Sequence, residues 1–108
     1  MKKEVIFDLK DINSKRDLIK DLHEPLALQV HEGSSFENWD AFDDDFCSFN
    51  FEYVTGEKPT EVNLILTNWL KFESRFPDFA STLLSILAKN TDPSQRIDGI
   101  NFTFQIRL

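Results

Sequence analysis

Five carboxylates fall within the segment FENWDAFDDDFCSF, which spans residues 36 to 49, and no Lys or Arg lies among them. They belong to Glu37, Asp40, Asp43, Asp44 and Asp45. Carboxylates at this density can ligate a metal ion, transfer protons, or accept hydrogen bonds from the cationic groups of a partner. Each kind of chemistry needs a different arrangement, so the choice depends on how the intervening residues fold.

The spacing of the acids argues against a metal site and against catalysis. Asp43, Asp44 and Asp45 are consecutive, so on a helix they point apart, and the segment lacks the spacing and central Gly of an EF-hand. The single Cys47 forms no zinc-type pattern with the two His residues. Acid–base catalysis needs a concave site, which the back of a helix does not offer. We therefore expect no metal, no cofactor and no enzymatic activity.

The aromatic residues between the acids predict an amphipathic helix over residues 36–49, capped by Ser34 or Ser35. At 100° per residue its apolar stripe consists of Trp39, Phe42, Phe46 and Phe49. The opposite, acidic stripe holds Glu37, Asp40 and Asp44, with Asp43 and Asp45 flanking it on either side and Cys47 close by. A merely solvated face usually mixes Glu with Lys at i,i+4 spacing, whereas this face carries one sign of charge.

The distribution of charge along the whole chain also favours a basic partner. The net charge is −7, and residues 21–57 contain ten acids and no Lys or Arg, whereas the rest of the chain carries a slight positive excess. Nucleic-acid binding needs clustered Lys and Arg, so direct binding to nucleic acid is not expected. A field of this kind attracts a basic partner.

The elements that position the acidic helix follow from periodicity. Alternation predicts strands over residues 5–9 and 100–108, and an apolar run predicts a buried strand over 62–69. Helical spacing appears after Asn13 or Ser14, either of which can be the N-cap, and ends at Pro25; it appears again after Pro77, with a short helical turn at 70–76. Strands alternating with helices favour an α/β fold: two layers, with helices on one face of a three-stranded parallel sheet, in a single domain over 1–108.

The cellular location of the protein and the positions of its remaining polar residues are predicted from simpler features of the sequence. The start, MKKEVIFDLKD, is no signal peptide, and no stretch approaches transmembrane length, so we expect a cytoplasmic protein without membrane contact. His23 and His31 have no partners nearby in the sequence and are expected on the surface. Residues 50–61 are expected to be a turn-rich connection, with Glu52 and Tyr53 at the rim of a binding face.

The motif ENWDAF, preceded by a strand and by a helix ending in PLAL, resembles the E-N-x-D-A-L motif of the barstar family of ribonuclease inhibitors. The resemblance extends over most of the chain as a pattern of strands and helices, but only ENWDA is specific. It implies sheet order 1-2-3, no enzymatic activity, and two aspartates of this helix as the main binding residues. These match Asp40 and Asp44, the centre of the acidic stripe.

The resemblance also implies a partner. This is a cognate ribonuclease or nuclease toxin whose basic active site would be blocked in a 1:1 complex by a monomeric inhibitor or immunity protein. We predict partner contacts from Asp40, Asp44, Glu37, Asn38, Trp39, Asp43 and Cys47. Trp39 can alternatively belong to the edge of the core, and Cys47 can be structural. The alternative function is an acidic adaptor that recognises a basic protein other than a nuclease.

Overall fold

The computed structural model describes residues 1–29 and 36–108, and its elements alternate as an α/β fold requires. The strands are β1 (Lys2–Asp8), β2 (Glu61–Thr67) and β3 (Asn101–Ile106). The helical elements are α1 (Lys15–His23), α2 (Trp39–Phe46), α3 (Phe51–Thr55), α4 (Trp69–Arg75), α5 (Pro77–Asn90) and the 3₁₀ turn η1 (Pro93–Gln95).

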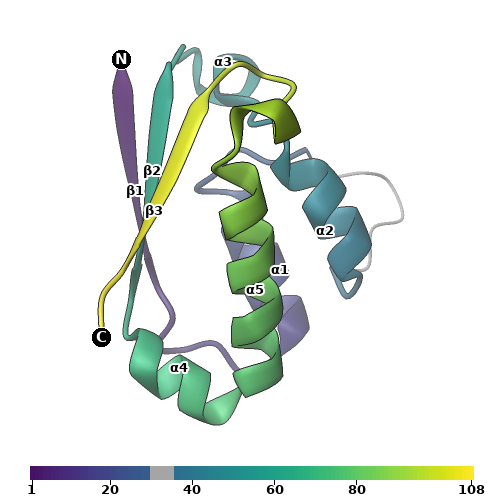
Figure 1. The fold of residues 1–108 in the computed structure, drawn as a ribbon, viewed down its shortest axis with the longest axis vertical. Helices are drawn as coiled ribbons and strands as arrows, with labels where there is room; N and C mark the ends of the chain where they lie inside the picture. Colours follow the sequence, from purple (N-terminus) through teal and green to yellow (C-terminus); the bar gives the residue numbers. More distant parts are fainter. Residues whose placement is uncertain (30–35) are drawn as a thin grey trace.

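The three strands form one parallel sheet in the predicted order, β1-β2-β3. Val5 of β1 pairs with Leu64 of β2, which pairs in turn with Phe104 of β3. The helices α1, α2 and α5 lie on the same side of this sheet, and α4 lies at one end (Figure 1). The prediction of a two-layer α/β fold with a parallel sheet is therefore confirmed.

The helix that carries the acids is shorter than residues 36–49. It begins at Trp39 because Asn38 has extended backbone angles and its Oδ1 accepts hydrogen bonds from the N–H groups of Asp40 and Ala41, at 2.9 and 3.4 Å. Asn38 is thus the N-cap, and the expectation that Ser34 or Ser35 would cap the helix is wrong; both serines lie outside the described residues. Phe36, with φ of 57°, precedes the helix.

The helix α3 occupies part of the stretch expected to be a turn-rich connection. It is a single turn in which Phe51 is buried, and Gly56 ends it in the left-handed conformation with φ of 77°. Five residues are too few to show a helical period in the sequence, which explains why this helix was not predicted.

The apolar stripe of α2 faces the sheet as predicted. Phe42 and Phe46 are buried, and the ring of Phe46 meets that of Phe102 of β3 edge-on, with centroids 5.1 Å apart. Trp39 is half-buried against Phe42. Each fully buried Phe contributes roughly 1.5–3 kcal/mol to folding, so these rings fix which side of α2 faces outward.

Candidate functional site

Asp40 and Asp44 lie on the outward side of α2, one helical turn apart, and both side chains are exposed. At i,i+4 spacing their Cβ atoms are about 5–6 Å apart. Neither side chain forms a hydrogen bond or an ion pair with any other residue that the structure describes. The two carboxylates are therefore available to a partner.

Asp43, on one flank of this pair, is held by α5. Its Oδ2 accepts a hydrogen bond from Lys89 Nζ at 2.8 Å, and its side chain is 26% exposed against 48% for Lys89. This contact raises the pKa of the Lys89 ammonium above its ordinary value, through the hydrogen bond and charge of Asp43 and, more weakly, the charge of Asp44. Asp43, predicted to contact a partner, thus already serves as an internal tie between α2 and α5.

Asp45, on the other flank, is directed towards α1. Its Oδ2 lies 3.5 Å from His23 Nε2, and both side chains are largely buried, at 8% and 5% exposure. His23 Nδ1 donates to the carbonyl of Ile19 at 2.7 Å, and its ring meets Phe36 edge-on. The prediction that His23 lies on the surface is wrong, because its ring fills the contact between α1 and α2. His31 lies outside the described residues.

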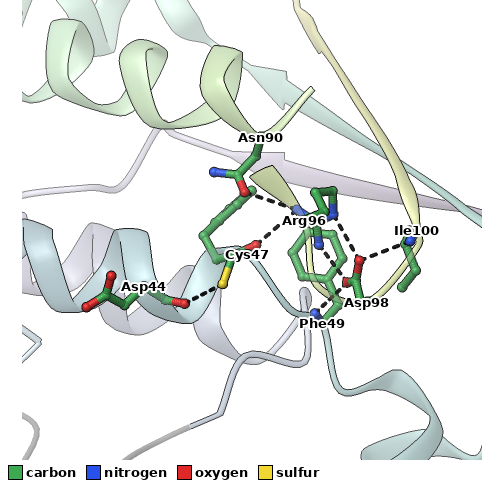
Figure 2. A network of polar contacts seen from close by, with 8 residues as sticks. Asp44, Cys47, Phe49, Asn90, Arg96, Asp98 and Ile100 are labelled. Atoms are coloured by element: carbon green, nitrogen blue, oxygen red, sulfur yellow. Dashed lines mark hydrogen bonds and ion pairs between the residues drawn. The ribbon is translucent and has the colours of Figure 1, made fainter. Parts of the chain in front are cut away.

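The C-terminal end of α2 is held by a buried group that we call the Arg96 clamp: Arg96, Asp98, Asn90 and the carbonyl of Phe46. Arg96 donates to both oxygens of Asp98, at 3.1 and 2.7 Å, to the Phe46 carbonyl at 3.0 Å and to Asn90 Oδ1 at 3.3 Å. Its guanidinium lies 4.1 Å from the ring centroid of Phe49 (Figure 2). The Phe46 carbonyl is among those that a helix end leaves without a partner, so the clamp joins α2 to the segment before β3.

Asp98 completes the clamp by accepting hydrogen bonds from the main chain. Its two oxygens accept from the N–H groups of Phe49 and Ile100, at 2.9 and 3.0 Å (Figure 2). The sequence predicts a loop over residues 90–99, NTDPSQRIDG, and does not predict the pair Arg96–Asp98 within it. An Arg and an Asp two positions apart carry no signal that they are buried, because burial here depends on contacts with α2 and α5.

The other predicted contact residues occupy mixed positions. Glu37 is exposed and takes part in contacts, so it is not a free carboxylate. Asn38 is exposed while its side chain caps α2, and Trp39 is half-buried. Cys47 is half-buried, and its thiol donates to the carbonyl of Asp44 at 2.9 Å (Figure 2). These residues surround Asp40 and Asp44 but are less accessible or already engaged.

The arrangement supports binding through charge more readily than through a cleft. No group of three or more His, Cys, Asp or Glu residues within 1–29 and 36–108 has the geometry to hold a metal ion. In the same ranges, no helix has the length and hydrophobicity needed to cross a membrane. A convex helix that presents carboxylates can accept charge-assisted hydrogen bonds from Arg, Lys or protonated His of another protein.

Comparison with models of known protein families gives a match. The model of the family described as Barstar (barnase inhibitor) matches residues 2–107, which is nearly the whole chain. No curated protein and no solved structure matches the chain.

Proposed function

Because this chain belongs to the barstar family, whose members are inhibitors and not enzymes, we propose that it binds the basic active site of a cognate ribonuclease and blocks it with Asp40 and Asp44. In this proposal the two carboxylates occupy positions where the enzyme would otherwise hold phosphates of RNA. The inhibitor acts as a monomer in a 1:1 complex, in the cytoplasm, and protects the cell from its own ribonuclease or from a nuclease toxin.

One observation carries the proposal: of the four aspartates in α2, the two central ones are exposed and have no partner within residues 1–29 and 36–108, whereas the two flanking ones face neighbouring helices. The flanking contacts and the Arg96 clamp fix α2 before any partner arrives. Binding therefore costs little ordering of the site, and fixed carboxylates lose less entropy when they meet Arg or Lys. This favours tight binding by a small number of charges.

The long-range charge favours the same partner. The acidic excess of residues 21–57 creates a negative field around α2, and a ribonuclease active site is positively charged because it holds phosphates. Opposite fields raise the rate of encounter, and this rate falls as salt is added. The same field repels nucleic acid, so the proposal includes no direct binding to RNA or DNA.

The test measures inhibition of a panel of ribonucleases, including barnase, by the wild-type protein and by Asp44→Asn and Asp40→Asn. Each substitution is expected to weaken the complex by about 2–5 kcal/mol, because cationic groups of the enzyme would be buried without a partner. The control is Glu4→Gln, since Glu4 is exposed on β1 and points away from the helices, opposite to Val5. The proposal is wrong if folded Asp44→Asn inhibits as well as the wild type. Failure to inhibit any ribonuclease would favour the acidic adaptor.

A further inference from the structure

Lys89 places a positive charge at one edge of the acidic surface. It lies in the last turn of α5, and its ammonium donates to Asp43 of α2 at 2.8 Å. The charge of Asp44 also acts on the Lys89 ammonium, so Lys89 belongs to the same electrostatic surface as the proposed binding residues. The surface around the α2 carboxylates therefore carries a positive charge at its α5 edge.

The two edges of the acidic surface differ. On the α1 side, Asp45 lies against His23, whose side chain is buried and presents almost nothing to solvent; the exposed Arg16 of the same helix lies over Phe36, 5.7 Å from its ring centroid. On the α5 side, about half of the Lys89 side chain is exposed, so a bound partner would meet its ammonium directly. The Lys89 ammonium is protonated at neutral pH, as lysine ordinarily is, and its raised pKa extends this charge to higher pH.

A fixed cation changes which partners fit. A wholly cationic surface that covered α2 would bring its own charges against Lys89, and like charges in contact weaken a complex and exclude wrong partners. A partner with an acidic side chain on that side would instead gain a pair. Lys89 also keeps Asp43 occupied, which leaves Asp40 and Asp44 as the aspartates of α2 without a partner among the residues that the structure describes.

We infer that Lys89 determines partner specificity: the acidic face fits a basic site bordered, on the side that meets α5, by an acidic side chain. This inference rests on the proposed function, because it describes the enzyme that Asp40 and Asp44 would block. It goes beyond the proposed function because it assigns a role to Lys89, which lies outside α2. It also predicts opposite effects of removing the Lys89 charge on the binding of a purely cationic peptide and on the binding of the ribonuclease.

The experiment compares Lys89→Met with Lys71→Met, which removes the same charge from an exposed position on α4. Lys89→Arg keeps the charge and should behave as the wild type. The first probe is a peptide of nine arginines, which has no acidic group; Lys89→Met should bind it roughly three times more tightly than Lys71→Met does. The second probe is the ribonuclease in the panel that the wild type binds most tightly; Lys89→Met should bind it roughly three times more weakly. Thermal unfolding confirms that each variant is folded.

The outcomes separate the inference from the proposed function. Equal binding of the arginine peptide by both Met variants would show that Lys89 does not screen the face, and would overturn the inference. Tighter or unchanged binding of the ribonuclease by Lys89→Met would refute the inference that an acidic side chain of the partner lies on the side that meets α5. If the wild type binds no ribonuclease, the proposed function fails, and the peptide alone decides whether Lys89 screens the acidic face.

Discussion

Replacing Arg96 with methionine tests how strongly the Arg96 clamp holds α2. Methionine keeps an unbranched apolar stem beside Phe49 but removes four hydrogen bonds. The carboxylate of Asp98, whose side chain is 9% exposed, keeps only its two bonds from main-chain N–H groups. Removing one partner of a buried ion pair costs about 3–5 kcal/mol, because the other charge stays buried without compensation.

We therefore expect Arg96→Met to lower the free energy of unfolding by about 3–5 kcal/mol. Small domains are usually stable by about 5–15 kcal/mol, so the variant should remain folded at 25 °C but unfold at a much lower urea concentration. Adding Asp98→Asn should recover part of the loss, because the uncompensated charge is then gone. The control is Arg107→Met, an exposed position where a change within about 0.5 kcal/mol is expected.

Hydrogen exchange shows where the loss acts. In Arg96→Met the amides in the last turn of α2, near Phe46, should exchange much faster, whereas those in the centre of β2 should change only as far as global stability does. A loss below about 1 kcal/mol, or unchanged exchange in α2, would refute the view that Arg96 holds this helix.

Further substitutions test the other contacts. Asp45→Asn should lower the free energy of unfolding by about 1–3 kcal/mol, because the carboxylate of Asp45 is buried against α1. Asp44 is exposed, so Asp44→Asn should change the free energy of unfolding by less than about 0.5 kcal/mol. Equal effects of the two substitutions in urea unfolding would contradict this difference. Asn68 has φ of 58°, so Asn68→Ala should cost about 1–2 kcal/mol and Asn68→Gly less, and thermal unfolding of both compares them. A hydrogen bond from Lys3 lowers the pKa of Glu57. The ionised Glu57 therefore stabilises the fold at pH values above the ordinary pKa of a glutamic acid, and this stabilisation is lost as the pH falls through the lowered pKa. Urea unfolding at pH 7 and pH 3 should therefore show a smaller loss for Glu57→Gln than for the wild type.

The sequence predicts the sides of α2 well because helical period is a local property. Residues spaced three and four apart must share a face, so the positions of Phe42 and Phe46 inside and of Asp40 and Asp44 outside follow from the spacing alone. The same spacing placed Asp43 on one flank of the acidic stripe. The outer strands β1 and β3 follow for the same reason, since alternation over a few residues is enough to identify them, and the central strand β2 follows from a continuous apolar run.

The sequence does not reveal which side chains pair with one another between elements that are distant in the chain. The pairs Asp43–Lys89 and His23–Asp45 join residues far apart in the chain, and nothing at either position indicates the other. The division of the aspartates into anchoring and free residues therefore depends on tertiary packing. Secondary structure suggested which acids are central, and only the packed helices indicate which acids are already engaged.

The Arg96 clamp has a consequence for synthesis on the ribosome. Phe46, whose carbonyl Arg96 holds, is made 50 positions before Arg96 itself. At about 5–20 residues per second, roughly 3–10 s pass between the two, during which α2 can form but lacks its anchor. A nascent chain therefore carries the four aspartates of α2 before the clamp that fixes this helix can form, and under the proposed function full inhibitory strength should arise only after residue 98 has emerged from the exit tunnel.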